Sequence, residues 1–208
     1  MPESPRCCRC CISFIFSAGL TTVFLWLNLH IDHPNYFIQN FQVPPLNLTA
    51  HDTRNATIAF NLKLANGNKD KGIYYDEVNI ALYYGGINRT IALGNTSIPP
   101  FYQGHKKKAI KAQTMEARRF PLQTALKEVS NNRTVVFQVD LATAVRFKTI
   151  WWKTKRHRMS VGGDVHVNRE GMTADNKDIE LKSSGAEFGC YHTPAAMLAL
   201  VVLLLILC

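Results

Sequence analysis

Alternation of apolar and polar residues with a period of two runs through most of the middle of the chain. It is clearest in Thr57–Leu64, where Ile58, Phe60, Leu62 and Leu64 fall on one side of an extended strand. Because successive side chains of a strand point to opposite faces, such a segment predicts a strand with one face buried in a core. The segments that we predict as strands are Tyr36–Val43, Thr57–Leu64, Val78–Tyr84, Ile87–Leu93, Lys107–Met115, Val135–Leu141, Val145–Trp152 and Val161–Asn168.

Turn-forming residue pairs separate these segments. The pairs are Asn66-Gly67, Gly85-Gly86, Gly94-Asn95, Pro99-Pro100 and Asn131-Asn132. One segment departs from the pattern, because Leu122, Leu126 and Val129 have helical spacing and predict one short helix within Phe120–Ser130. Seven to eight short strands with regular breaks predict a mainly β domain, an antiparallel β-sandwich of the fibronectin III or immunoglobulin-like type. No internal repeat is visible, so we expect one such domain.

An apolar segment near the start, Cys10–Ile31, runs 22 residues without a charged side chain. A hydrocarbon core of about 30 Å needs about 20 helical residues, so the length predicts an uncleaved transmembrane signal anchor. The alternative is a cleaved signal peptide, but its apolar core is shorter and the small residues at 17–19 are poorly placed for cleavage. Arg6 and Arg9 before the segment and Asp32 after it predict a cytosolic N-terminus, with the rest of the chain across the membrane.

A second apolar segment, Pro194–Cys208, lies at the C-terminal end of the sequence. It follows a run of small residues, Ser183–Ala186, and a moderately polar spacer, Glu187–Thr193. This order is typical of a signal for a glycosylphosphatidylinositol (GPI) anchor, which predicts removal of the tail and attachment at Ser183 or Ser184. The alternative is a short tail-anchor helix.

Five Asn-x-Ser/Thr sequons, more than chance predicts, all lie between the two apolar segments. They are Asn47, Asn55, Asn88, Asn95 and Asn132. Together with the charge asymmetry they favour a glycosylated extracellular domain. The predicted organisation is a cytosolic tail at 1–9, a transmembrane anchor at 10–31, an extracellular domain at 33–182 and a GPI-attachment signal at 183–208.

The cysteines avoid the predicted extracellular domain, since residues 33–182 contain none. Four of them crowd the cytosolic edge of the predicted span beside basic residues, which favours S-palmitoylation over the alternative of unmodified thiols. These four are Cys7, Cys8, Cys10 and Cys11. Zinc binding is not expected, because a second pair of ligands at the required spacing is missing.

Catalytic motifs are absent from the sequence. It contains no G-x-S-x-G, no phosphate-binding glycine-rich loop and no H-E-x-x-H, and its histidines are scattered. We therefore expect neither an enzyme nor a bound cofactor or metal ion.

Two blocks of sequence resemble the plant NDR/HIN-like family. These blocks are Asn66–Val78 (NGNKDKGIYYDEV) and Phe101–Lys108 (FYQGHKKK), and the similarity extends to the N-terminal CCRCCISFIFSAGLTTVFLWLNL and to VRFKTIWWKTK at Val145–Lys155. Gly67 is a departure, since the family often has proline at this position. The resemblance implies a late-embryogenesis-abundant group-two type sandwich and a plasma-membrane protein of plant immunity. It also implies resistance signalling against bacterial pathogens, adhesion between plasma membrane and cell wall, and association with other membrane-bound immune proteins.

The positive charge is concentrated in one part of the chain. The formal net charge is +9, and Phe101–Arg158 holds 14 Lys or Arg against three acidic residues. Such a surface concentrates polyanions, so we hypothesise contact with acidic cell-wall polysaccharide or with the membrane surface. The alternative is a basic face that only aids solubility. The candidate contact residues are Lys106, Lys107, Lys108, Lys153, Lys155, Arg156 and Arg158.

Adjacent tryptophans at Trp151-Trp152 fall within the last part of a predicted strand. Neighbours on a strand point to opposite faces, so we expect one ring in the core and one facing outward. The outward ring could stack on a sugar, lie at a membrane interface or only cover a sheet edge. Tyr74-Tyr75 and Tyr83-Tyr84 present the same choice, with core and cross-strand packing as the default.

The function that these patterns favour is an anchored immune and adhesion component of the plasma membrane, without a nucleic-acid partner. The alternative is a stress-protective or lipid-contacting module tethered to the membrane. A basic nucleic-acid binder is disfavoured because the predicted topology places the domain outside the cell. Double anchoring favours the first function, because a diffusible protectant gains nothing from attachment.

Overall fold

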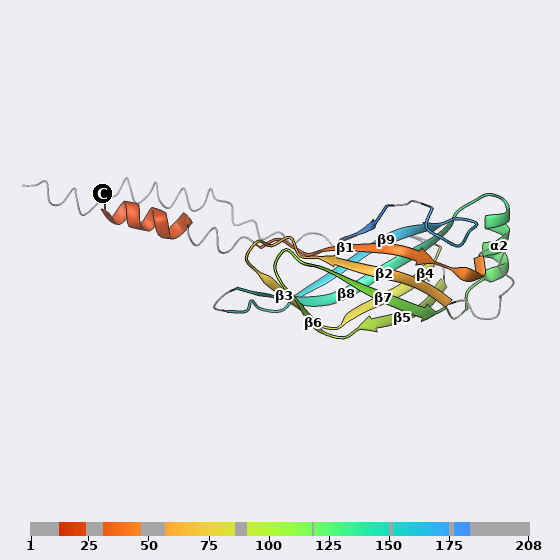
Figure 1. Cartoon of the computed structure of the whole chain (residues 1–208), viewed down its shortest axis with the longest axis horizontal. Helices are drawn as coiled ribbons and strands as arrows, with labels where there is room; N and C mark the ends of the chain where they lie inside the picture. Colours follow the sequence, from red (N-terminus) through yellow and green to blue (C-terminus); the bar gives the residue numbers. More distant parts are fainter. Residues whose placement is uncertain are drawn as a thin grey trace, which may run out of the picture. The chain divides into compact units, whose positions relative to one another are not determined.

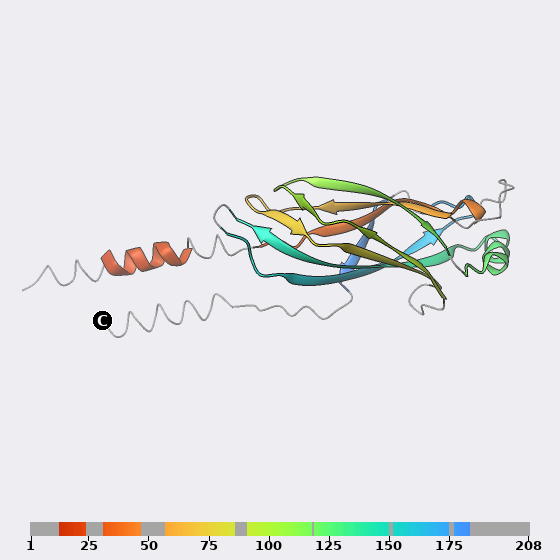
Figure 2. The same cartoon turned by 90° about the horizontal axis from the view of Figure 1, so that it is seen from below.

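The computed structural model describes residues 13–23, 31–46, 57–85, 91–117, 119–149, 152–174 and 177–183. The chain divides into two units. One unit, Asp32–Ala186, contains every described strand and is called the β unit below. The other comprises Met1–Ile31 and Glu187–Cys208, of which the structure describes the helix at residues 13–23. Figures 1 and 2 show the chain from two directions.

The β unit consists of ten described strands and two short helical segments (Figure 1). In chain order the elements are β1 Asn35–Gln42, the 3-10 helix η1 Pro44–Leu46, β2 Thr57–Ala65, β3 Gly72–Tyr75, β4 Val78–Tyr84, β5 Ile91–Ile98, β6 Phe101–Gln103, β7 Lys108–Glu116, the helix α2 Leu122–Ser130, β8 Val135–Lys148, β9 His157–Val167 and β10 Ile179–Ser183.

All described strand pairs are antiparallel, and they form one connected path in the order β5-β4-β8-β9-β10-β1-β2-β7, with β3 and β6 attached beside β8. In Figure 2, the orange and green strands β2 and β7 lie across the unit from the teal strand β8. The two ends of the path meet through side chains, since Thr96 Oγ1 of β5 donates a hydrogen bond of 3.1 Å to Gln113 Oε1 of β7. The sheet therefore curls into a nearly closed barrel.

The predicted alternation is confirmed in the strands that form the core. Every second residue of β2 is buried, namely Ile58, Phe60, Leu62 and Leu64, and the residues between them are half-buried. β8 also buries alternate residues on its inward face. In its centre, where β4 and β9 flank it, residues on both faces are buried. Burial of apolar surface at about 25 cal/mol per Å² makes this interior the main source of stability.

The prediction of a mainly antiparallel β fold with one short helix is confirmed, whereas the sandwich type is not. Seven to eight strands were expected, and the described residues form ten. The short strands β3, β6 and β10 were missed because segments of three to five residues carry too little alternation to recognise. Val135–Leu141 and Val145–Trp152 were predicted as separate strands, but they belong to one 14-residue strand that ends at Lys148.

Prolines interrupt a long hairpin in which β3 and β4 form one arm and β5 and β6 form the other, so that β4 pairs with β5 and β3 pairs with β6. Pro99-Pro100 separates β5 from β6, and it lies opposite Asp76-Glu77, which separates β3 from β4. Proline has no N–H to donate to a ladder, so the pairing stops there and resumes at Tyr75 with Phe101.

The helix α2 covers one end of the β unit, which we call the far end. Ala125 and Val129 are its buried residues, and Leu122 and Leu126 are half-buried, so the predicted apolar face is the face that packs. Beside it lies a cluster of rings with centroids 5.5–6.0 Å apart. Its members are Phe41, Phe60, Tyr84, Phe120 and Phe137.

The helix at residues 13–23 lies within the predicted transmembrane segment Cys10–Ile31, whose other residues, apart from Ile31, lie outside the described part. None of the described helices combines the length and the apolar character that a membrane crossing needs.

Candidate functional site

Strand register brings three loops and the N-terminal boundary of the β unit to the end opposite α2. Asn35 pairs with Ala65, and Ala65 pairs with Lys108, so the start of β1, the end of β2 and the start of β7 lie together. Gly72 pairs with Lys148, which adds the start of β3 and the end of β8. We call this the entry end, because the chain enters the β unit here at Asp32.

The C-terminal boundary of the β unit lies on the same side but further along the strands. Leu181 of β10 pairs with Tyr36 near the start of β1, whereas Ser183 pairs with Val161, the fifth residue of β9, which in turn pairs with Leu141 in the middle of β8. The loops of the entry end are 66–71, 104–107 and 149–156.

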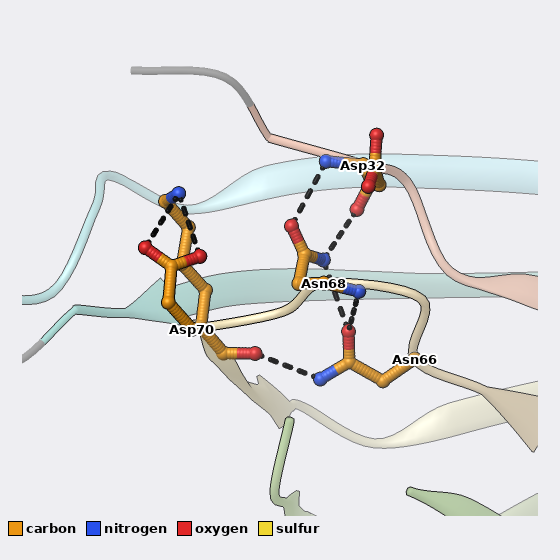
Figure 3. Close-up of polar contacts among 5 residues, drawn as sticks. Asp32, Asn66, Asn68 and Asp70 are labelled. Carbon is orange, nitrogen blue, oxygen red and sulfur yellow. Dashed lines mark hydrogen bonds and ion pairs between the residues drawn. The ribbon is translucent and has the colours of Figure 1, made fainter. Parts of the chain in front are cut away.

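Two asparagines hold the entry end together through their side chains (Figure 3). Asn68 Oδ1 accepts a hydrogen bond of 2.9 Å from the backbone N–H of Asp32, and Asn68 Nδ2 donates one of 2.7 Å to the Asp32 carbonyl. Asn66 Oδ1 accepts from both the backbone N–H and Nδ2 of Asn68, at 3.0 and 2.9 Å. Both asparagines are buried, so Asp32 is fixed to the loop 66–71 at its N–H and at its carbonyl.

The same network reaches the next loop. Asn66 Nδ2 donates to the carbonyls of Lys71 and Gly104, at 2.9 and 3.0 Å, and the N–H of Lys106 donates to the carbonyl of Asn68. Lys71 is only 2% exposed, and its Nζ lies 3.1 Å from a carboxylate oxygen of Asp70. Sequence reasoning treated Asn66-Gly67 only as a turn. The signal for more was the ability of Asn to bond the backbone two residues on, which is the Asn66–Asn68 contact.

The candidate polyanion-contact residues all lie at or beside the entry end. Lys106, Lys107 and Lys108 are exposed at the loop 104–107 and the first position of β7. Lys106 has a φ of 51°, a left-handed conformation that the turn requires. The other four, Lys153, Lys155, Arg156 and Arg158, are exposed on the loop 149–156 and the start of β9.

Two tyrosines lie between the two groups of basic residues. Tyr74 of β3 and Tyr102 of β6 pair across the strands, with ring centroids 4.6 Å apart. Lys153 Nζ lies 4.2 Å from the Tyr74 ring centroid, and Lys148 Nζ lies 5.7 Å from that of Tyr102. On the other side Gln103, the residue after Tyr102, donates from Nε2 to the carbonyl of Lys107 at 2.7 Å. The basic residues therefore belong to one surface with aromatic rings at its centre.

The tryptophan prediction is corrected by the end of β8 at Lys148. Trp152 lies beyond this strand, in a turn where its carbonyl accepts a hydrogen bond of 2.9 Å from the N–H of Thr149. The argument that neighbours on a strand face opposite sides therefore does not apply here. Trp152 is 56% exposed, and Trp151 lies outside the described residues.

One acidic residue neutralises part of this surface. Asp76 Oδ2 accepts a hydrogen bond from Arg156 Nε, and Asp76 Oδ1 lies 3.9 Å from a guanidinium nitrogen of Arg146. Arg156, a candidate contact residue, is thus already engaged within the protein, whereas Lys106–Lys108 extend into solvent.

The modification sites are only partly described. Asn95 on β5 and Asn132 after α2 are exposed, as an acceptor of a glycan must be, and Ser183 is exposed at the end of β10. The remaining predicted sites lie outside the described residues. They are Asn47, Asn55, Asn88, Ser184, Cys7, Cys8, Cys10 and Cys11.

A groove of about 700 Å³ lies where β5 and β7 approach without forming a ladder. It is lined by side chains of both edges, including Leu93, Met115 and the sequon residue Asn95. No local sequence pattern indicates this groove, because it depends on which strands lie at the two ends of the path. Within the described part of the chain, no three His, Cys, Asp or Glu residues are grouped closely enough to hold a metal ion.

Comparison with known proteins finds one matching family model and relatives in a plant. A family model described as late embryogenesis abundant protein matches residues 61–163. The chain is 47% identical over 192 residues to protein NDR1 of Arabidopsis thaliana, which covers 88% of this chain and 85% of that protein. It is 29% identical over 156 residues to NDR1/HIN1-like protein 26 of the same plant, covering 72% of each. A solution structure described as that of a late embryogenesis abundant protein is similar at 11% identity and a TM-score of 0.39, covering 79% of this chain and 88% of that one.

Proposed function

The chain belongs to the NDR/HIN-like family, and from that premise we propose that it is a membrane-anchored component of plant immunity that acts in resistance signalling against bacterial pathogens. The observation that carries the proposal is the 47% identity to NDR1. The similarity covers 88% of the chain, which is more than the β unit alone comprises. It therefore includes sequence from the end segments as well as the domain.

Membrane anchoring through Cys10–Ile31 is the first part of the proposal. The described helix within it, residues 13–23, contains no charged residue and exposes large apolar side chains such as Phe14, Phe16 and Leu20. Its threonine hydroxyls bond within the helix: Thr21 Oγ1 donates to the Ser17 carbonyl at 2.7 Å, and Thr22 Oγ1 donates to the Ala18 carbonyl at 2.8 Å. A hydroxyl that is satisfied inside its own helix costs less in a medium without water.

The proposal places the β unit outside the cell as a glycosylated domain. Two sequon residues, Asn95 and Asn132, are exposed and accessible to a transferase. The GPI anchor at Ser183 or Ser184 and palmitoylation of the N-terminal cysteines complete the proposed attachment. The proposed partners are other immune proteins of the plasma membrane, and the role extends to adhesion between that membrane and the cell wall.

Complementation tests the immune role. The chain is expressed in Arabidopsis plants that lack NDR1, and bacterial growth in the leaves is compared with that in plants carrying an empty vector. We expect growth to fall toward the level in plants that retain NDR1. If the protein accumulates at the plasma membrane and bacterial growth does not change, the immune role is wrong.

Enzymatic removal of N-glycans tests the topology. The full chain from plant cells should lose mass, and a variant with all five asparagines changed to Gln should not. Retention of the untreated protein in the pellet after alkaline extraction of membranes tests the anchor. An unchanged mass would contradict the extracellular placement, and release into the supernatant would contradict the anchor.

A stress-protective or lipid-contacting module is the second candidate, which the family model described as late embryogenesis abundant protein favours. The same plants distinguish the two. Improved survival of drying with unchanged bacterial growth would favour protection over immunity.

A further inference from the structure

We infer that the entry end is a bilayer-contact surface, in which the lysines of the loops 104–107 and 149–156, together with Tyr74, Tyr102 and Trp152, lie against phosphate-bearing lipid head groups. The inference deepens the proposed function and rests on its membrane anchor. It replaces the open choice between cell-wall polysaccharide and membrane with one partner.

The first argument is the length of the tether. The proposed span ends at Ile31, and the next residue, Asp32, is held by Asn68 through both its N–H and its carbonyl. Each residue extends a chain by at most about 3.6 Å, so the span leaves almost no linker between the bilayer and the entry end. The last described strand, β10, runs toward this end and finishes at Ser183 beside the middle of β9, so a lipid anchor attached at Ser183 or Ser184 would tether the same side of the β unit to the same membrane.

The second argument is the chemistry of the exposed residues. Tyr102 is 48% exposed and Trp152 is 56% exposed, and both lie among lysines. Tyrosine and tryptophan concentrate at the membrane–water interface, where an apolar ring with a polar edge meets both environments. Lysine contributes there through attraction to negatively charged lipid phosphates, which the phosphatidylglycerol of the test supplies, while its methylene stem covers apolar surface.

Packing holds the tyrosine rings in place before any contact with lipid. The Tyr102 ring lies over Gly72, where a Cβ would come within 2.2 Å of its hydroxyl oxygen, so only glycine leaves room for the ring in this position. The neighbouring Tyr74 is covered by Lys153. A surface that is ordered in advance loses less conformational entropy on contact.

The position of the basic surface on the tethered side of the β unit favours the membrane over the cell wall. A contact with the cell wall requires a surface that faces away from the bilayer, whereas these residues lie at the tethered end of the β unit. Distance from the bilayer also weakens a charge contact, since the Debye length at physiological salt is about 8 Å. The basic surface is therefore positioned to act on the membrane that anchors it.

The test uses the full chain in lipid nanodiscs of phosphatidylcholine alone or mixed with phosphatidylglycerol, and measures backbone hydrogen exchange by mass spectrometry. We expect slower exchange in peptides covering residues 101–110 and 148–158 when phosphatidylglycerol is present. High salt should remove the difference. Peptides of α2 should exchange equally in both lipids.

A charge variant and a matched control identify the cause. The variant combines Lys106→Asn, Lys107→Gln and Lys108→Gln, with Asn at position 106 because it tolerates the left-handed φ of 51°. Loss of three lysines should weaken contact on the order of 10²-fold and abolish the slower exchange. The control combines Arg119→Asn, Lys127→Gln and Arg133→Gln, which removes three charges near α2. Asn is used at position 119 because Arg119 also has a positive φ, of 59°. The control should retain the slower exchange.

Three outcomes would contradict the proposal, each in a different way. If the chain inserts into nanodiscs but its peptides exchange equally fast in both lipids, the anchor stands and the bilayer contact is wrong. Protection of the same peptides by added polygalacturonate in phosphatidylcholine discs, but not by phosphatidylglycerol, overturns it in favour of the wall. If the chain does not co-elute with the nanodiscs, the anchor of the proposed function is wrong, and the contact that rests on it is wrong as well.

Discussion

The two ends of the β unit are built from the same strands and differ in charge and in what holds them together. The entry end, taken as residues 31–35, 65–77, 102–108 and 146–158, carries 11 Lys or Arg against four acidic residues. The described residues of the far end carry Arg119, Lys127, Arg133 and Arg169 against Glu116, Glu128 and Glu170. The entry end is therefore strongly positive, whereas the described part of the far end is nearly neutral.

The interactions differ in the same way. A cluster of five rings fills the far end, whereas the entry end combines ring pairs such as Tyr75 with Phe101 with side-chain hydrogen bonds from Asn66 and Asn68 that order its loops. Ring packing and the polar ordering of loops are thus separated along the strands, so we expect a change in one to leave the other largely in place.

The largest expected effect comes from opening the ring cluster at the far end with Phe137→Ala. Phe137 is fully buried and contacts Phe41, Tyr84 and Phe120. We expect a loss of about 3–5 kcal/mol in the free energy of unfolding, measured by urea denaturation. Trp152→Ala at the entry end is the control and should change stability by less than about 0.5 kcal/mol. Equal losses in both variants would contradict the separation.

Removing the polar link at the entry end with Asn68→Ala should cost about 1–3 kcal/mol, because it breaks the bonds to Asp32 and leaves buried groups without partners. Hydrogen exchange should locate the effect at the Asp32 amide and the loop 66–71, with α2 unchanged below the unfolding transition. Asn79→Ala, at an exposed position of β4, is the control. A uniform rise in exchange across the β unit would show that the link is not local.

High pH should distinguish tyrosines of the two ends. Burial raises the pKa of Tyr84 at the far end to about 12, with a further contribution from the nearby Glu128 carboxylate. Burial raises the pKa of Tyr75 at the entry end further still, and the charge of Tyr36 adds to this. Because unfolded tyrosine has a pKa of about 10, the stability from these protonated phenols is complete below pH 10 and is lost as pH rises through the folded pKa values.

Phenolate absorbance measures the order of these titrations. Tyr84 should ionise before Tyr75, and Tyr84→Phe should remove the step near pH 12. A native Tyr84 that titrates at the ordinary value would contradict its burial.

The smallest effect is expected midway between the ends, at Asp178. Asp178 Oδ2 lies 2.6 Å from Lys63 Nζ, and Asp178 Oδ1 accepts a hydrogen bond of 2.6 Å from Gln39 Nε2. These bonds lower the pKa of the Asp178 carboxyl. The stabilisation is present above the unfolded pKa of about 3.9 and is lost as pH falls through the lower folded value. Asp178→Asn should cost about 0.5 kcal/mol at neutral pH, as expected for an exposed pair, and nothing in strong acid.

Denaturation at both pH values, with Lys63→Met and the double variant completing a cycle, measures the Asp178 contribution. A difference between wild type and Asp178→Asn that persists in strong acid would show that packing, and not charge, is responsible.

Sequence patterns predicted the local features well. The alternation in Thr57–Leu64 identified the inward residues of β2, the spacing of Leu122, Leu126 and Val129 identified α2, and the exposure of Lys106–Lys108 followed from their charge. Each of these depends on a few neighbouring residues, whose period or polarity determines which side meets water.

The candidate surface could be predicted only in part. Lys106–Lys108 and Lys153–Arg158 were recognised as basic, and the sequence left open whether Tyr74 packs or faces outward. Neither Tyr102 between the two basic groups nor the role of Asn68 was recognised. Asn68 and Asp32 are 36 positions apart, and no local pattern indicates that they bond. Trp152 was misplaced because the end of β8 depends on its pairing with β3 and β9.

The sequence by itself determined which residues face the core, where the helix forms and that one stretch of the chain is strongly basic, because these follow from hydrophobicity and charge of local segments. Only the tertiary structure decided that Asp32 and three separate loops meet at one end, and that β5 and β7 nearly close the sheet. Strand pairing joins residues far apart in the chain, and the free energy of a pairing depends on the whole set of neighbours and not on any one segment.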